Sequence, residues 1–372
     1  MIRLQEITLH EIRLPLKEPF RISSGLTTER RIMLLRLRDV NGVTTWSECV
    51  AGEKPNYSSE TIDAAWLVIS EYVAPRVLGV DFEKPVDVHP ALEKDFRGHH
   101  MAKAALEMGI WALWAERDGM PLARLLGGTQ TRIPTGISIG IQPSPEALVA
   151  RVKRALDDGF RKIKMKVNPG EDVQFVGAVR EAFPDAPLMV DANNAYTLDD
   201  IAQLKKLDQF RFMMIEQPLA YDDIVRHATL QKQLETPICL DESITSVERA
   251  EDMIALGSGK IINIKAGRVG GYSASLAIHD LCMKAGVPVW CGGMLESGVG
   301  RAYNVALASL ANFTLPGDLS PSRRYWERDL VEPEWTMDSE GCVEVPVGRA
   351  GIGVAAEVGR IEEVTVRREV VR

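Results

Sequence analysis

Five charged residues in the middle of the chain are spaced almost evenly, and each one ends a short apolar run. They are Lys166, Asp191, Glu216, Asp241 and Lys265, separated by steps of 25, 25, 25 and 24 residues. Each step has the length of one strand, one helix and two short loops, so the spacing predicts successive β/α units. In a parallel (β/α) barrel the C-terminal ends of the strands meet at one mouth, where active sites are built. The spacing therefore predicts three carboxylates between lysines around one cavity.

The three carboxylates, Asp191, Glu216 and Asp241, predict a metal site. Hard oxygen ligands from neighbouring strands suit Mg²⁺, which keeps waters or takes substrate oxygens at its other positions. One acidic residue after a strand would be explained by capping of the next helix. Three in register, each ending a hydrophobic strand, are not explained in that way. None of the six histidines falls at one of these strand ends, which argues against zinc or iron.

The lysines of the run KIKMKV predict a general base beside the metal. Lys162, Lys164 and Lys166 alternate with apolar residues, so their ammonium groups share one face of a strand. Two lysines close together near a divalent cation each lower the pKa of the other, and a neutral amine near pH 7 can take a proton. We expect Lys162, near the strand start, to be an ordinary solvated lysine. Lys265 approaches the same cavity from the far side.

Bases on two sides of a carbon, beside a cation that holds an adjacent carboxylate, predict removal of a proton α to that carboxylate. The cation and a lysine would stabilise the resulting enediolate. Reprotonation on the other face then gives racemisation, whereas loss of a β-hydroxyl gives dehydration. The residues alone leave both outcomes open.

The elements that position these side chains begin with an N-terminal α+β unit, residues 1–128. Strands are predicted at residues 3–14, 31–38 and 45–48, and residues 19–25 have the composition of a mobile loop. Ser59 is predicted to cap a helix that runs to about residue 73. A second helix, from about residue 99 to 118, carries an apolar stripe that we expect to pack against the next domain.

From about residue 133 the chain alternates between short apolar strands and helical segments, which indicates parallel pairing with both faces covered. Seven or eight such units favour an α/β fold with a modified TIM-type (β/α) barrel at residues 129–320 over an open doubly wound sheet. No GxGxxG follows the first strand, which counts against a dinucleotide fold. Residues 321–372 lose the alternation and are predicted to return to the N-terminal unit, which caps the barrel. The predicted barrel strands are residues 135–141, 162–167, 188–191, 212–216, 238–241, 261–265, 287–291 and, more weakly, 313–318.

Composition excludes several classes of partner. The 372-residue chain has a formal net charge of −8, which gives no support for nucleic acid or anionic membranes as partners. No apolar stretch approaches the length of a membrane span, and the N-terminus does not read as a signal peptide. The five cysteines are scattered and lack any CxxC pair, which indicates free thiols and a cytoplasmic protein.

The combined motifs resemble the enolase superfamily. The runs KMK, DANNAY, EQP, DES and NIKAGRVGG resemble its muconate lactonizing enzyme subgroup. The stretch GGMLESGVGRAYNVALASLANFTLPGDLSPSRRY is similar to the o-succinylbenzoate synthase and N-acylamino acid (N-succinylamino acid) racemase family. The resemblance covers essentially the whole chain.

This resemblance implies a role for each residue of the motifs. Asp191, Glu216 and Asp241 would ligate Mg²⁺, for which Mn²⁺ or Co²⁺ can substitute. Lys166 would remove the α-proton with Lys164 tuning it, and Lys265 would be the opposite acid or base in a racemase, or a cation that stabilises the enediolate in a synthase. The implied substrate-binding residues are Phe20, Ser23 and Tyr57 from an N-terminal lid, together with Ser138, Asn193, Gly293, Met294 and Glu296.

The implied reaction is dehydration of 2-succinyl-6-hydroxy-2,4-cyclohexadiene-1-carboxylate to o-succinylbenzoate, as in menaquinone synthesis, together with racemisation of N-succinyl- or N-acylamino acids. The alternatives are racemisation as the main role, muconate cycloisomerisation, which the GGMLESG stretch disfavours, and a non-catalytic barrel that binds a small carboxylate. Opposed lysines argue against the last, because binding a carboxylate needs no pair of bases. A small-molecule carboxylate is the expected partner, and the resemblance implies a homo-oligomer, either a dimer or an octamer.

Overall fold

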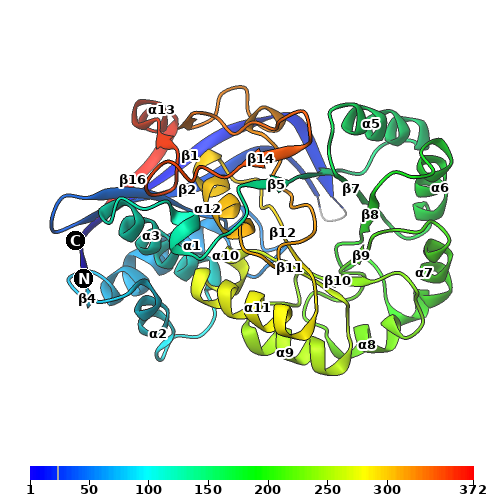
Figure 1. Cartoon of the computed structure of the whole chain (residues 1–372), viewed down its shortest axis with the longest axis horizontal. Helices are drawn as coiled ribbons and strands as arrows, with labels where there is room; N and C mark the ends of the chain where they lie inside the picture. The colour runs from blue at the N-terminus through cyan, green and yellow to red at the C-terminus, as the bar shows by residue number, and fades with distance from the viewer. Residues whose placement is uncertain (23–24) are drawn as a thin grey trace.

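The two ends of the chain share an antiparallel sheet. The structure is a computed structural model and describes residues 1–22 and 25–372 (Figure 1). The sheet has the order β16-β1-β2-β3, and β4 pairs with β1 at one end. Its pairing of β1 with β16 brings the last strand back beside the first. The bounds are β1 (Ile2–Ile22), β2 (Gly25–Asp39), β3 (Thr44–Cys49), β4 (Asp81–Phe82) and β16 (Thr365–Val371).

The start of the first helix differs from the prediction. The helix α1 (Ile62–Val68) is capped by Thr61, whose hydroxyl accepts the N–H of Ala64, and not by Ser59. The carboxylate of Glu60 accepts the N–H groups of Met101 and Ala102, in the first turn of the helix that begins at His100. The helix α1 therefore begins two residues later than predicted, and Glu60 lies outside its first turn.

The long helix α3 (His100–Arg117) joins the two parts of the molecule. Ala104 and Trp111 belong to the hydrophobic core of the barrel, whereas Leu106, Ile110 and Leu113 belong to the core of the N-terminal sheet. The predicted stripe therefore packs against the barrel only in part. The same helix is buried on both faces because it lies between two cores.

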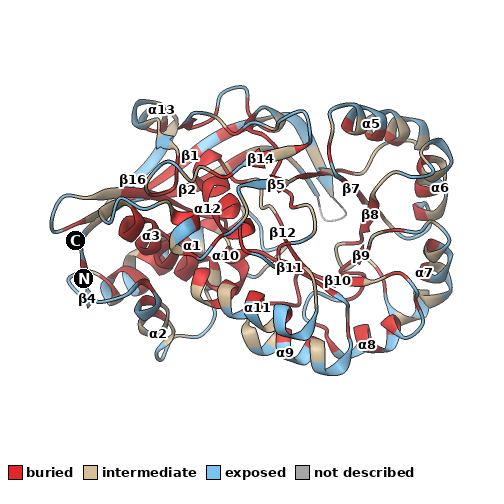
Figure 2. Cartoon of the chain, in the orientation of Figure 1, coloured by how far each residue is buried: buried red, intermediate tan, exposed pale blue. Residues whose placement is uncertain are grey.

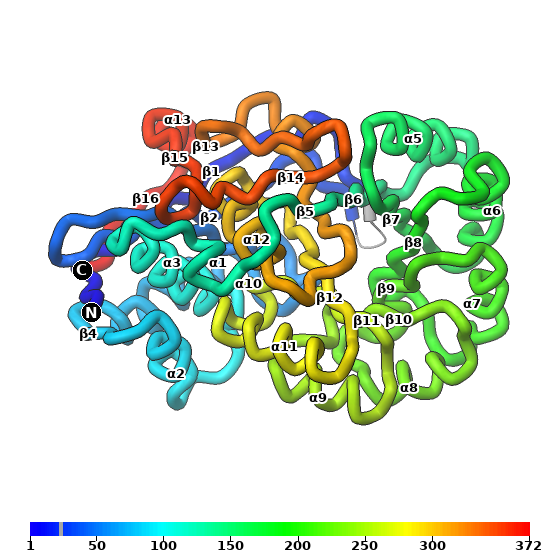
Figure 3. Tube along the Cα trace, in the orientation of Figure 1, coloured from blue at the N-terminus to red at the C-terminus, as the bar shows by residue number. Residues whose placement is uncertain are grey.

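A curled parallel sheet of seven strands, in the order β12-β11-β10-β9-β8-β7-β6, forms most of the barrel (Figure 3). The strands are β6 (Gly136–Ile139), β7 (Lys162–Lys166), β8 (Leu188–Asp191), β9 (Ile215–Glu216), β10 (Ile238–Leu240), β11 (Ile261–Ile264) and β12 (Val289–Cys291). Helices cover its outer face, and they include α5 (Pro145–Asp157), α6 (Asp172–Ala182), α7 (Ile201–Asp208), α8 (Val225–Gln231), α9 (Val247–Leu256), α11 (Tyr272–Ala285) and α12 (Gly298–Ala308). All of these except the fully buried α12 have exposed outer surfaces (Figure 2).

The eighth position of the barrel is filled by single bridges instead of a strand. Phe313 bridges Val289 of β12, and Gly317 bridges Thr135 just before β6, both in parallel. Residues 313–318 therefore span the two edges of the seven-stranded sheet. The predicted fold class, a modified TIM-type barrel with an N-terminal α+β capping unit, is confirmed. The division at residues 1–128, 129–320 and 321–372 stays a prediction.

The segment predicted as a mobile loop belongs largely to a hairpin. Phe20, Arg21 and Ile22 continue β1 and pair with Thr27, Leu26 and Gly25 of β2. The polar composition of the segment concealed this pairing, because strand extension depends on the partner strand and not on local propensity. The predicted site residue Ser23 lies outside the described residues.

Two further predictions concern the whole molecule. All five cysteines are free, and Cys49, Cys239, Cys282 and Cys291 are buried, as expected. Within the described ranges, no helix has the length and apolar character needed to span a bilayer.

Candidate active site

The order of the strands places the five evenly spaced residues around one cavity. Asp191 and Glu216 end β8 and β9, and Asp241 follows β10 directly. Lys166 ends β7 on one side of these three strands, and Lys265 follows β11 on the other. Lys166 pairs with Asp191 across β7 and β8, and Asp191 pairs with Glu216 across β8 and β9. The three carboxylates therefore lie between two opposed lysines.

The three carboxylates are almost completely buried, with exposed fractions of 1%, 0% and 1% for Asp191, Glu216 and Asp241. Glu216 Oε1 accepts the side-chain N–H of Asn263 at 2.7 Å. Glu216 Oε2, by contrast, accepts no hydrogen bond from any described residue. Burial, followed by the charge of Asp191, raises the pKa of Glu216 to about 8. Three buried carboxylates so close together need cations to compensate their charge.

Lysines supply part of that charge. Lys166 Nζ donates to Asp191 Oδ2 at 2.5 Å and to Asn193 Oδ1 at 2.6 Å. Lys164 Nζ lies 3.2 Å from Glu216 Oε2 and 3.5 Å from Asp191 Oδ2. Burial alone would lower the pKa of Lys164, but the neighbouring carboxylates outweigh it and raise that pKa well above its usual value. The expectation of a lowered lysine pKa beside a divalent cation stays a prediction.

The opposite side of the cavity has a tighter cationic arrangement. Lys265 Nζ donates to Asp241 Oδ2 at 2.8 Å and to the hydroxyl of Tyr57 at 3.1 Å. Arg268 donates to Asp241 Oδ1 and, at 3.1 Å, to the same hydroxyl. Burial acts to raise the pKa of Asp241, but Lys265 and Arg268 overcome it and hold that pKa below its usual value. The carboxylates in turn raise the pKa of Lys265 despite its burial.

The donor set fits a divalent cation. Asp191, Glu216 and Asp241 offer hard oxygens from three adjacent strand ends, and Glu216 Oε2 accepts no hydrogen bond from a described residue although Lys164 Nζ lies 3.2 Å away. In this structure the three carboxylates are paired with lysines. Within the described residues, no group of three His, Cys, Asp or Glu side chains is arranged closely enough to bind a metal ion. Binding of a cation here therefore requires the carboxylates to exchange lysine contacts for metal contacts.

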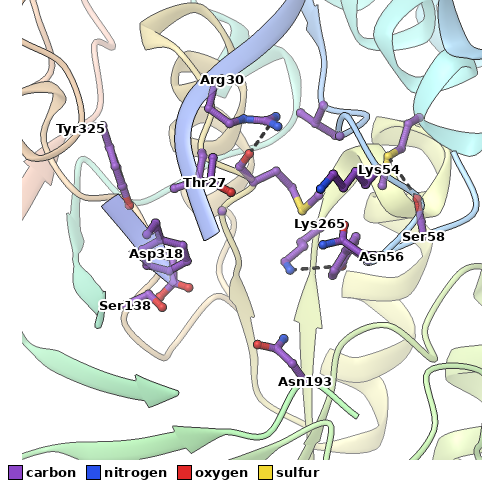
Figure 4. Close-up of a pocket in the computed structure, with 18 of the residues that line it drawn as sticks. Thr27, Arg30, Lys54, Asn56, Ser58, Ser138, Asn193, Lys265, Asp318 and Tyr325 are labelled. Atoms are coloured by element: carbon purple, nitrogen blue, oxygen red, sulfur yellow. Dashed lines mark hydrogen bonds between the residues drawn. The ribbon is translucent and has the colours of Figure 1, made fainter. Parts of the chain in front are cut away.

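A cleft of about 160 Å³ opens above these groups, between the barrel mouth and the N-terminal unit (Figure 4). It is lined by the predicted residues Phe20, Tyr57, Ser138, Asn193, Gly293 and Met294, as well as by Lys164, Lys166 and Lys265. The hydroxyl of Ser138 is buried and finds no hydrogen-bond partner in the part of the chain that is described. Tyr57 reaches the barrel from the N-terminal unit and donates to Asp241 Oδ1 at 2.9 Å.

Glu296 is the predicted binding residue that the structure does not bring to this cleft. Its carboxylate is 3% exposed and accepts the N–H of Met294 and the side-chain N–H of Asn304, each at 2.8 Å. It lies behind the loop after β12, where it holds Met294 in place. The positive φ of 56° at Leu295 turns the chain between Met294, which lines the cleft, and Glu296, which does not.

Two residues of the site were misjudged or missed. Lys162 is fully buried, not solvated, with Nζ 3.4 Å from the ring centre of Trp290 and 3.3 Å from Asp318 Oδ1. Asp318 also pairs with Lys164 at 2.6 Å. Asp318 ends the weak eighth strand segment, so its position in the series was the signal that could have identified it.

Supporting residues hold the loops that carry the carboxylates. Gln217 Oε1 accepts the N–H groups of Asp241 and Ser243, and Gln217 itself adopts a φ of 36°. Glu242 accepts the side-chain N–H groups of Asn193 and Asn194, each at 3.3 Å. The sequence contains these residues inside the EQP, DES and DANNAY runs, but only the structure shows which loop each one restrains.

Comparison with known proteins agrees with this geometry. Residues 4–127 match the mandelate racemase / muconate lactonizing enzyme N-terminal domain, and residues 147–358 match the enolase C-terminal domain-like family. The chain is 47% identical over 364 residues to an o-succinylbenzoate synthase of Geobacillus kaustophilus, covering 98% of this chain and 96% of that protein. It is 48% identical over 365 residues to an N-succinylamino acid racemase of Thermus thermophilus, covering 98% of each.

A solved structure shows the same fold. A member of the enolase superfamily from Listeria innocua superposes with a TM-score of 0.95 at 40% identity, covering 100% of this chain and 99% of that one. The two domain families and the full-length relatives agree. The chain belongs to the o-succinylbenzoate synthase and N-succinylamino acid racemase family of the enolase superfamily.

Proposed function

We propose that the chain is an enzyme that removes a proton α to a carboxylate, acting as an o-succinylbenzoate synthase that also racemises N-succinyl- or N-acylamino acids. The observation that carries this proposal is the placement of Lys166 and Lys265 on opposite sides of the three carboxylate strands. Relatives with both names cover nearly the full length of the chain. Muconate cycloisomerisation is not favoured by these relatives.

Enzymes of this family generally use a divalent metal ion. Here we assign Asp191, Glu216 and Asp241 as its ligands and Mg²⁺ as the ion, with Mn²⁺ or Co²⁺ as substitutes. When bound, the ion supplies positive charge to the substrate carboxylate and so favours the enediolate. Carboxylates engaged by the ion no longer raise the pKa of the lysines to the same extent, so a lysine can lose its proton more readily.

Lys166 is the residue we assign to take the α-proton, because its Nζ faces the cleft beside Asn193. Lys164, held by Glu216, Asp191 and Asp318, places a second positive charge behind it. Lys265 faces the other side of the substrate as an ammonium, positioned by Tyr57 and Asp241. In racemisation Lys265 gives its proton to the opposite face. In dehydration Lys265 remains a cation, and the proton that Lys166 has taken goes to the β-hydroxyl, which leaves as water.

The remaining assignments complete the proposal. Phe20, Tyr57, Ser138, Asn193, Gly293 and Met294 surround the substrate, while Ser23 and Glu296 keep only the support of the family resemblance. The substrate is a small-molecule carboxylate, in line with the relatives that act on small molecules. A cytoplasmic location and a homo-oligomeric state, either dimer or octamer, remain proposals.

A single experiment tests the reaction class. Purified protein with Mg²⁺ is incubated in D₂O with an N-succinylamino acid, and in parallel with 2-succinyl-6-hydroxy-2,4-cyclohexadiene-1-carboxylate. We expect deuterium at the α-carbon in the first reaction and the ultraviolet absorbance of an aromatic product in the second. Absence of both would refute the proposal, and their relative rates would show which activity dominates.

A further inference from the structure

The end of the cleft formed by the N-terminal unit contains a buried cation that is not matched by an anion. Arg30 lies on β2, lines the cleft and is only 7% exposed. Its Nη2 donates to the backbone carbonyl of Met294 at 3.4 Å, a long contact. Arg30 Nε has no hydrogen-bond partner in the described structure, and no described carboxylate lies within ion-pair distance of its guanidinium.

The carboxylates nearest to Arg30 are engaged elsewhere. Glu48 accepts hydrogen bonds from the N–H and hydroxyl of Ser297 and the N–H of Gly300, at the start of α12. Glu296 holds Met294 and Asn304, and Glu53 accepts the N–H of Arg31. These three carboxylates favour the charged form of Arg30 from a distance, but none of them forms an ion pair with it. A buried guanidinium in this state is costly unless a ligand completes its hydrogen bonds.

A second cation stands at the same end. Lys54 is exposed, lines the cleft, and forms no ion pair with any residue the structure describes. Arg30 and Lys54 lie on the N-terminal side of the cleft, with Lys265 in the middle and Asn193 at the barrel end (Figure 4). The barrel end thus has its cations paired, whereas the N-terminal end presents two cations that remain available to a ligand.

We propose that Arg30, assisted by Lys54, binds a distal carboxylate of the substrate and selects dicarboxylates over neutral N-acyl compounds. The guanidinium of Arg30 is planar, and a group of this shape binds a carboxylate with two parallel hydrogen bonds. This inference rests on the proposed function, because it assumes that the α-carboxylate binds at the barrel end. It makes Arg30 a specificity-determining residue, whose contact lies away from the reacting carbon.

The test compares two substrates that differ in one charge. N-succinyl-L-phenylalanine carries a distal carboxylate, and N-succinamoyl-L-phenylalanine carries an amide in the same place. α-Deuterium exchange with Mg²⁺ is followed for the wild type, Arg30→Met and Arg30→Lys. Loss of one partner of a buried charge pair predicts a fall of roughly 30- to 1000-fold in kcat/KM for the succinyl substrate with Arg30→Met, mainly through KM. We expect the succinamoyl substrate to change by less than about threefold, and Arg30→Lys to recover part of the loss.

Controls separate this inference from the proposed function. Arg36 lies on the same strand but is exposed, so Arg36→Gln should leave the ratio between the two substrates unchanged. A wild type that exchanges neither substrate refutes the proposed function. A wild type that exchanges both at similar kcat/KM, or an Arg30→Met variant that loses both equally, overturns the role of Arg30. If Arg30→Met does not fold, the wild-type ratio and Arg30→Lys decide the question.

Discussion

The two ends of the cleft differ in how their charges are compensated. At the barrel end Lys164, Lys166 and Lys265 all lie within 4 Å of carboxylates that follow neighbouring strands. At the N-terminal end Arg30 and Lys54 have no such partner among the described residues. At the barrel end the lysines are held in place by ion pairs with the carboxylates, and such fixed positions suit proton transfer. At the N-terminal end the two cations can pair with an anionic group of a ligand, which suits substrate recognition.

Replacing the proposed base tests the barrel end most severely. Lys166→Ala removes the amine that faces the substrate, so we expect both α-exchange and dehydration to fall by about 10⁴-fold, at the upper end of general-base effects. Rates are measured with each substrate at saturating Mg²⁺. The melting temperature serves as a check on folding. Residual activity within tenfold of the wild type would assign the base to another residue.

Removal of metal should affect the barrel end alone. Dialysis against EDTA is expected to abolish exchange, and Mg²⁺ at about 100 times its Kd should raise the melting temperature of the metal-free protein by about 2–4 °C, since a bound ligand stabilises the folded state. Asp241→Asn should remove this thermal shift. Asp318→Asn is the matched control, because Asp318 is buried in the same cleft but is not among the proposed ligands. An equal loss of the shift in both variants would contradict the assignment.

The opposed lysine should separate the two reactions. Lys265→Arg keeps a positive charge but gives up its proton far less readily. We expect racemisation to fall by about 10²- to 10³-fold and dehydration by about tenfold, because only racemisation needs proton transfer on that side. Both rates are measured on the same preparation. Equal losses in the two reactions would argue against the division of roles.

At the N-terminal end, Lys54 should matter less than Arg30. Lys54 is exposed, so solvent screens its charge, and Lys54→Met should raise KM for N-succinyl substrates by about threefold to tenfold with kcat unchanged. Initial rates at low and high salt measure the effect, which should shrink as salt rises. A change in kcat that is independent of salt would move Lys54 into the barrel-end network.

Lowering the pH should destabilise the fold through protonation of His227, which lies outside the cleft. His227 is fully buried, with Nε2 accepting the N–H of Leu219 and Nδ1 donating to the carbonyl of Asp223, so burial lowers its pKa to about 4. Because the folded pKa lies below the unfolded value, the stability from neutral His227 is present above about pH 6.5 and is lost as the pH falls toward 4. The loss reaches about 3 kcal/mol. Urea unfolding at pH 7 and pH 4.5 measures it, and a His227→Gln variant should lose this part of the pH dependence.

The sequence predicted which charged strand ends meet at the barrel end because the information there is local. Each carboxylate or lysine ends its own apolar strand, and strands of a parallel sheet end at one edge. Asp191, Glu216, Asp241, Lys166 and Lys265 could therefore be grouped without knowing the packing. Predictions that depended on partner strands were weaker. The composition of residues 19–25 predicts a loop, whereas Phe20 to Ile22 pair with β2 in a hairpin. The helix α1 is likewise capped by Thr61 and not by the predicted Ser59.

The sequence by itself determined the order and spacing of the charges around the barrel mouth, since these follow from strand and helix periodicity. Only the tertiary structure decided how the charges are paired. Curling of the sheet brings Asp318 to Lys164 and buries Lys162 on Trp290. Docking of the N-terminal unit sets Tyr57 against Asp241 and turns Arg30 toward the cleft. These contacts join segments far apart in the chain, so no local pattern records them, and they depend on how two hydrophobic cores pack together.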